Sequence, residues 1–187
     1  MVRKLSILLI IVGLIIIGYS AFQIFKTKTV QTNSLEKAHE ILKKPKVDIE
    51  DFSPFMGDVV GILSIPRIDA ELPIVEGTDA DDLEKGVGHY KGTAWPMGND
   101  QIVLSGHRDT VFRRMGELEI GDELIVKVPY GEFSYKIEGT KVVDADDLTV
   151  IKPTAPNEVL TVTTCYPFRY VGNAPQRYII NAKPVNR

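Results

Sequence analysis

The chain of 187 residues is 44% hydrophobic and 25% charged, which suits one folded domain with an appendage and excludes collagen or wholesale disorder. Its formal net charge of -3 is unevenly spread, because the first 28 residues hold four basic side chains and no acidic one, which leaves 18 basic and 25 acidic residues for the remainder. So acidic a domain is a poor nucleic-acid binder, since non-specific attraction to phosphates needs a basic face.

Residues 5–25 form an apolar run of 21 without a charged side chain. At about 1.5 Å per residue, such a helix spans a hydrocarbon core of roughly 30 Å, so we predict a transmembrane helix. A cleaved signal peptide is the alternative, because Gly18-Tyr19-Ser20 resembles its cleavage site, but the length of the run favours an uncleaved signal-anchor. Both flanks are basic and leave the positive-inside rule undecided. We expect residues 1–4 to be a cytoplasmic tail and the C-terminal part to be translocated.

A juxtamembrane helix and linker are expected over residues 26–56, ahead of a folded domain over 57–187. Asn33-Ser34 stands before apolar residues at helical spacing, and Pro45 follows them. This pattern is typical of a short, capped amphipathic helix.

Beyond residue 57 the pattern is mostly that of strands bounded by Gly, Pro, Asp or Asn. The predicted strands are 59–65, 72–75, 102–104, 124–128, 133–137, 142–143, 159–163 and 178–182. Two helical pieces are expected, one after Thr78 that runs through residues 82–85 and one over 111–118. About eight strands with only short helices favour a mainly β fold, a closed or nearly closed barrel, with an open sandwich as the alternative.

Cys165 is the only cysteine of the chain. An exported domain stabilised by disulfides normally carries an even number, so the lone thiol is either a buried apolar residue or a nucleophile. Strand alternation places Leu160 and Val162 on one face and the thiol, with two threonines, on the more polar face at the strand's end. This placement favours the nucleophile.

A base for this thiol must be one of three histidines. His39 falls in the membrane-proximal helix, whereas His107 follows a glycine at the end of a predicted strand, where a surface turn residue is the alternative interpretation. If the strands on either side of the loop 166–175 pair in antiparallel fashion, Arg177 can approach Cys165.

Three segments resemble the catalytic signatures of the sortases, the membrane-anchored cysteine transpeptidases of Gram-positive bacteria. They are Leu104-Ser105-Gly106-His107, Thr161-Val162-Thr163-Thr164-Cys165 and Pro175-Gln176-Arg177-Tyr178. The resemblance covers roughly residues 57–185, and the segments 86–90, 107–110 and 165–168 are most like the class D branch. Val162 stands where the family more often has Leu, which is a conservative change on the inward face.

The resemblance implies an eight-stranded sortase-like β-barrel with short helices and a reaction at an LPxTG-like sorting signal. Cys165 would cleave after the threonine of the signal and form a thioester acyl-enzyme, while His107 would protonate the departing amine. Arg177 stays protonated, so it would hold the carbonyl or the developing oxyanion. Transfer to an amine of peptidoglycan or its precursor would anchor surface proteins to the wall, with hydrolysis as a side reaction.

Four further residues are expected to contribute to substrate binding, namely His89, Thr163, Thr164 and Arg169. His89 is equally well interpreted as a hydrogen-bonded structural histidine, and Arg169 is the second choice for the role of Arg177. Some sortases bind calcium through acidic clusters like those at 79–84 and 144–147, but solvated turns and helix starts explain them better. No metal and no cofactor are predicted.

Two other classes of protein compete with this interpretation. An L,D-transpeptidase also uses Cys and His, but its Ser-His-Gly-Cys signature does not occur in this sequence. A noncatalytic wall-binding module would need neither a lone thiol nor an arginine across a hairpin from it. The expected partners are therefore sorting signals, a peptidoglycan precursor amine and the membrane. The expected location is the cell membrane, crossed once, with the catalytic domain at the Gram-positive cell surface.

Overall fold

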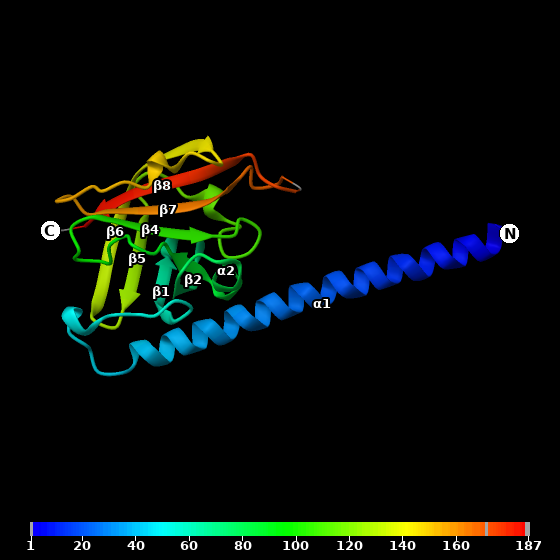
Figure 1. Cartoon of the computed structure of the whole chain (residues 1–187), viewed down its shortest axis with the longest axis horizontal. Helices are drawn as coiled ribbons and strands as arrows, with labels where there is room; N and C mark the ends of the chain where they lie inside the picture. Colours follow the sequence, from blue (N-terminus) through cyan, green and yellow to red (C-terminus); the bar gives the residue numbers. More distant parts are fainter. Residues whose placement is uncertain (1, 171, 186–187) are drawn as a thin grey trace.

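The computed structural model describes residues 2–170 and 172–185, and it consists of a β-domain and one long projecting helix, α1 (Val2–Leu42) (Figure 1). The strands are β1 (Val59–Ile65), β2 (Ala70–Glu76), β3 (Val87–His89), β4 (Gln101–Gly106), β5 (Glu123–Val128), β6 (Gly131–Asp144), β7 (Val159–Tyr166) and β8 (Gln176–Pro184). The short helices are α2 (Ala80–Lys85) and the 3-10 turns η1 (Ile49–Asp51), η2 (Pro66–Ile68), η3 (Met115–Glu117) and η4 (Leu148–Val150).

The eight strands form a closed barrel in the order β1-β2-β3-β4-β7-β8-β6-β5, which confirms the predicted barrel over the sandwich. The β2–β3 and β4–β7 pairs are parallel and the other pairs are antiparallel. Apolar side chains fill the interior, and Tyr135 and Phe112 are the largest of those that are fully buried. Closure gives each of these strands a hydrogen-bonded neighbour on both sides.

The predicted number of strands is correct, although two of the predictions are wrong in detail. The segments 133–137 and 142–143 belong to one strand, β6, whose pairing with β8 shifts register between Ile137 and Gly139. This irregularity interrupts the alternation of polar and apolar residues without ending the strand. β3 was not predicted, because its three residues are too few to show a period.

Of the two predicted helical pieces, the first is confirmed as α2, whereas the prediction over 111–118 is wrong. That segment consists of successive turns that end in η3. Its apolar residues have near-helical spacing because Val111, Phe112, Met115 and Leu118 all reach the barrel core. The spacing therefore reflects the burial of these side chains. The backbone brings them to the core through successive turns and a short 3-10 helix instead of an α-helix.

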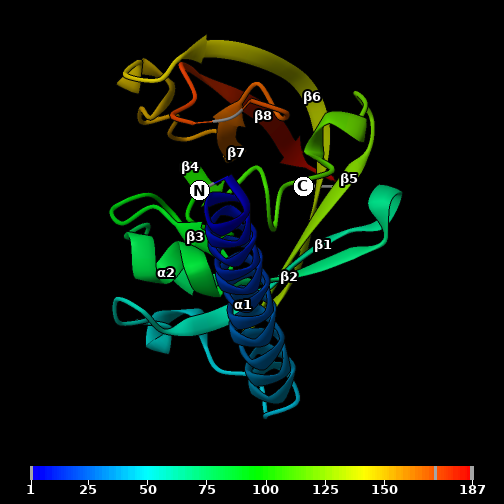
Figure 2. The ribbon, with the colours of Figure 1, turned by 90° about the vertical axis from the view of Figure 1, so that its right-hand side faces the viewer.

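α1 is continuous through Asn33-Ser34, where we predicted the start of a separate helix. The side chains of Ser34 and Ala38 are buried, and Ala38 packs on Val59, Ile62 and Val75 of β1 and β2. The first half of the helix extends beyond the domain in Figure 1, and in Figure 2 it points toward the viewer in front of the barrel. Within the described part of the chain, α1 is one helix long and apolar enough to cross a membrane, with a window of mean hydropathy 2.6 that has no buried residue. It is a candidate membrane anchor.

Candidate active site

The pairing of β7 with β8 places Cys165 directly opposite Arg177, as the antiparallel prediction requires. Residues directly opposite each other in such a pair project from the same face, with Cβ atoms about 4.5–5.5 Å apart. Both side chains are half-buried. The thiol and the guanidinium therefore project from the same face of the sheet, although 11 other residues separate them in the sequence.

His107 reaches the same end of the barrel from β4. This strand runs parallel to β7, with Gly106 beside Thr164, so the next residue of each strand is His107 and Cys165. The Thr164 hydroxyl donates a buried hydrogen bond of 2.7 Å to the Gly106 carbonyl and fastens the two strand ends together. A Cβ at residue 106 would lie 2.6 Å from the Phe112 ring, so glycine is needed where the chain turns toward His107.

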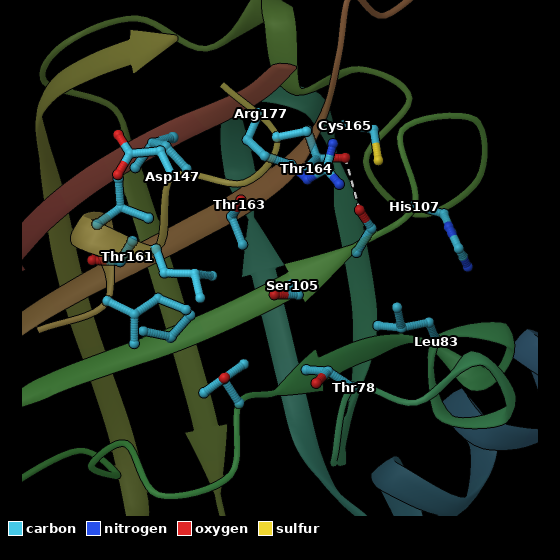
Figure 3. Close-up of a pocket in the computed structure, with 18 residues that line it drawn as sticks. Thr78, Leu83, Ser105, His107, Asp147, Thr161, Thr163, Thr164, Cys165 and Arg177 are labelled. Carbon is cyan, nitrogen blue, oxygen red and sulfur yellow. Dashed lines mark hydrogen bonds between the residues drawn. The ribbon is translucent and has the colours of Figure 1, made fainter. Parts of the chain in front are cut away.

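The three side chains line one cavity of about 270 Å³. Figure 3 shows them at the same end of this cavity, where β4 and β7 end. The rest of the wall is largely apolar and includes Leu83, Val103, Leu148, Val150, Ile151 and Ile179. An apolar cleft with a few convergent polar groups at one end is the usual form of a small binding site.

The Arg177 guanidinium is positioned by the backbone. Its Nη1 donates to the carbonyl oxygens of Gln176 at 3.0 Å and Ala174 at 3.3 Å. No hydrogen bond from its Nη2 or Nε to any residue within the described ranges is found, so these N–H groups remain available to a ligand in the cavity. An arginine held in this way offers fixed donors to a carbonyl or an oxyanion.

A part of the cavity wall that the sequence did not identify comes from the segment around η4. Asp147 accepts hydrogen bonds from the Thr149 amide at 2.9 Å and from its hydroxyl at 2.5 Å. These hydrogen bonds lower the pKa of the Asp147 carboxyl below its ordinary value, so its carboxylate places a negative charge in the cavity wall. The Asp-x-Thr pattern indicates a turn, but no local signal tells which cavity the turn borders.

The four predicted substrate-binding residues fall in different places. Thr163 and Thr164 line the cavity with Cys165. Arg169 is exposed and lines a second cavity, between α1 and the loop after β4, so its position does not favour a role as substitute for Arg177.

His89 lies away from the cavity, and the alternative interpretation as a structural histidine is the one its contacts support. Its side chain is 1% exposed, with Nδ1 2.7 Å from Glu76 Oε2 and Nε2 3.0 Å from the Ala94 carbonyl oxygen. The ring stacks on Trp95, with 3.9 Å between the centroids. A histidine enclosed in this way has no open face for a substrate.

The acidic segments predicted as solvated turns are engaged in local contacts. Asp82, in the first of them, lies 3.2 Å from Lys85 Nζ, which also donates to the Gly57 carbonyl. Among the residues that the structure describes, no group of three or more His, Cys, Asp or Glu side chains is arranged to hold a metal ion.

Comparison with known proteins supports the resemblance seen in the sequence. A family model for the sortase domain matches residues 63–185. The chain is 52% identical over 197 aligned positions to Sortase D of Bacillus subtilis (strain 168), an alignment that covers 99% of this chain and 100% of that protein.

Solved structures agree with the match in sequence. A Sortase D5 transpeptidase of Clostridium perfringens superposes with a TM-score of 0.73 at 27% identity, covering 84% of this chain and 99% of the other. Sortase C of the same species, solved with the C-terminal cell wall sorting motif, gives a TM-score of 0.65 at 27% identity over 85% of this chain and 89% of the other.

The closed barrel and the matches to known proteins identify the chain as a cysteine transpeptidase. The chain belongs to the sortase family, whose members act on LPxTG-type sorting signals. The near-full-length match to a Sortase D confirms the resemblance to the class D branch.

Proposed function

We propose that Cys165, His107 and Arg177 are the catalytic residues with which this sortase anchors secreted proteins to the cell wall. The assignment rests on one observation, namely that these side chains lie at the same end of one cavity. Strand register supports it twice, because β8 sets Arg177 opposite Cys165 and β4 delivers His107 beside it. Cys165 and Arg177 thus lie in two neighbouring strands of the barrel, and His107 directly follows a third.

In the first half-reaction, the Cys165 thiolate attacks the carbonyl carbon of the threonine in the signal. The negative charge that develops on the carbonyl oxygen is held by Arg177. His107, as imidazolium, gives its proton to the departing amine nitrogen as the C–N bond breaks. The products are a thioester on Cys165 and the released C-terminal fragment.

In the second half-reaction, an amine of peptidoglycan or its precursor attacks the thioester carbon. The amine loses a proton to His107, the C–S bond breaks and an amide forms, which restores the thiolate and the imidazolium. Water in place of the amine gives hydrolysis. The apolar wall of the cavity suits the leucine and proline of an LPxTG-like signal, and Thr163 offers a hydroxyl near Cys165, whereas the Thr164 hydroxyl is engaged with the Gly106 carbonyl.

The chain is proposed to divide into a cytoplasmic tail over 1–4, a transmembrane anchor over 5–25, a juxtamembrane helix and linker over 26–56 and the catalytic domain over 57–187. The continuity of α1 supports a short, stiff connection between the anchor and the barrel. In this topology the chain crosses the cell membrane once and holds the domain at the outer surface, where the sorting signal and a lipid-linked acceptor are confined to the same plane.

The test uses the full-length chain in neutral detergent micelles with an LPxTG peptide, with and without candidate amines, and product analysis by mass spectrometry. We expect a peptide–amine amide as the main product, a hydrolysed peptide when no amine is present, and a thioester adduct on Cys165. The variant C165A should give none of the three while retaining the thermal midpoint of the parent. Cleavage by C165A would overturn the assignment.

A further inference from the structure

We propose that a second cavity, between α1 and the loop after β4, binds the phosphate headgroup of an anionic membrane lipid. We call it the juxtamembrane cavity. It has a volume of about 1060 Å³, and its walls include Gln23, Gln31, Arg108, Thr110, Arg113 and Arg169. Figure 1 shows the end of β4, where this loop starts, on the side of the barrel that faces the projecting half of α1.

Unpartnered hydrogen-bond donors are concentrated at this cavity. Three buried side-chain polar atoms have no hydrogen-bond partner in the described part of the chain, namely Gln31 Nε2, Arg108 Nη1 and Thr110 Oγ1, and all three residues line the juxtamembrane cavity. The amide nitrogen and the guanidinium nitrogen are donors only, and the hydroxyl also donates. A ligand that satisfies all three must carry several acceptor oxygens, because buried donors without partners are destabilising.

The Arg108 guanidinium is held in place for such a ligand. Its Nη2 donates to the carbonyl oxygens of Tyr170 and Gly172, at 2.8 Å each, and its plane lies near the Tyr170 ring. One side of the group is therefore fixed by the β7–β8 loop, and Nη1 is a buried donor without a partner among the described residues. Preorganised arginine donors suit the oxygens of a phosphate.

The charge of the wall favours an anion. The charged side chains that line the cavity are Lys28, Arg108, Asp109, Arg113, Arg114, Glu117 and Arg169, five basic against two acidic. Glu117 is paired with Arg114 at 2.8 Å, and these two charges compensate each other, which leaves the other basic groups of the wall in excess over Asp109. This basic surface belongs to a domain in which acidic residues outnumber basic ones.

The position of the cavity along α1 indicates that the anion comes from a membrane. This step rests on the proposed transmembrane anchor. The charge-free run ends at Phe25, whereas the cavity reaches from Gln23 to Gln31. At about 1.5 Å per residue it extends about 9 Å beyond the run. The polar headgroup layer on each side of the hydrocarbon core is roughly 5–8 Å deep. The part of the cavity beyond the apolar run therefore lies at the level of the lipid headgroups.

The experiment measures lipid binding by the full-length chain in neutral detergent, by native mass spectrometry and by thermal midpoint, with phosphatidylglycerol, phosphatidylcholine or inorganic phosphate added. We expect phosphatidylglycerol to be retained and to raise the midpoint, as a ligand of the folded state must. The triple variant K28Q/R113Q/R169Q should bind it at least about tenfold more weakly, because each basic residue near a lipid surface adds attraction. The matched control K136Q/K141Q/K152Q removes the same charge from exposed sites elsewhere on the domain and should bind like the parent.

A neutral variant separates the cavity from general electrostatics. Q31L removes a donor that has no partner, so it should keep or raise the midpoint without lipid and diminish the increase produced by phosphatidylglycerol. Equal binding by the parent and the triple variant would overturn the proposal, as would equal losses in the triple variant and its control. Inorganic phosphate that stabilises the chain as well as the lipid does would assign the cavity to a soluble anion instead. No readout involves peptide cleavage, so these failures leave the transpeptidase assignment untouched.

Discussion

His107 and His89 each follow a glycine at the end of a short strand, yet the two regions around them differ. His89 ends β3 and lies opposite Leu104, where the loop before β4 covers it with Trp95. His107 follows the C-terminal end of β4 and lines the same cavity as Cys165. The β3–β4 pair is antiparallel, so the two histidines leave it at opposite ends.

The number of local contacts distinguishes the two histidines, because the contacts of His89 are those of a structural residue and His107 is open to a ligand. The His89 ring has partners at 2.7, 3.0 and 3.1 Å, so its nitrogens are engaged. Within the described ranges, no hydrogen bond of the His107 ring to a protein group is found, so its nitrogens are free to exchange protons with a substrate. Four substitutions test this contrast.

The largest effect is expected for His107→Gln. Loss of the proton donor should lower kcat/KM for peptide cleavage by roughly 10²–10⁴-fold, the usual contribution of a general acid–base group. The thermal midpoint should stay within about 2 °C of the parent, because a change worth 1 kcal/mol shifts it by roughly that much. Steady-state cleavage and thermal unfolding in the same micelles measure both. A variant with near-parent turnover would remove His107 from the mechanism.

Arg177→Gln should lower kcat by about 10²–10³-fold, the cost of losing an oxyanion donor. Arg177→Lys should recover only part of the rate, because an ammonium lacks the planar set of donors. Lys141→Gln, an exposed change on β6, is the charge-matched control and should cleave like the parent. If Arg177→Gln and the control are equally active, the oxyanion role is wrong.

His89→Ala should act on stability instead of on chemistry. It leaves the buried Glu76 carboxylate without its partner, which should lower the free energy of unfolding by about 3 kcal/mol. The control is His39→Ala, which removes a half-exposed contact with Glu71 and should cost less than about 1 kcal/mol. Urea unfolding in micelles gives both values. The contrast between the histidines fails if His89→Ala is as stable as the control.

The smallest effect concerns Asp100, which fixes the end of the loop over His89. Its Oδ1 accepts from the amides of Thr154 at 2.5 Å, Gln101 at 2.8 Å and Ala155 at 3.1 Å, and these hydrogen bonds lower the pKa of the carboxyl. A lowered folded-state pKa contributes stability above the unfolded value of about 3.9, and this contribution is lost as the pH falls through the folded value.

Asp100→Asn should therefore be less stable than the parent at pH 7, and the gap should narrow as the pH falls below about 3.9. Thermal midpoints of the two chains between neutral and acid pH measure the gap. A gap that stays constant with pH would mean that the carboxylate charge contributes nothing to the loop.

Much of the barrel could be predicted from local pattern. An apolar run bounded by turn residues identified β1, and alternation in β7 gave the side on which Leu160 and Val162 enter the core. β3 could not be found, because its place depends on parallel pairing with β2, which lies on the far side of α2 in the sequence. The long β6 was divided for a related reason, since its continuity comes from β8.

The site divides in the same way. The lone thiol, the glycine before His107 and the hairpin that could bring Arg177 to Cys165 are visible in the sequence, because they depend on residue type and short spacing. The wall around Asp147 and the burial of His89 are not visible, because each depends on segments distant along the chain. The same holds for the juxtamembrane cavity, which exists only where α1 passes the loop after β4.

The candidate anchor segment and the chemical groups available at the site could be identified from the amino-acid sequence, because hydropathy and reactivity belong to individual residues and short runs. The enclosure of His89 and the position of Arg177 opposite Cys165 depend on the folded chain. Burial and cross-strand pairing depend on neighbouring segments, and the closed barrel brings these segments together from separate strands.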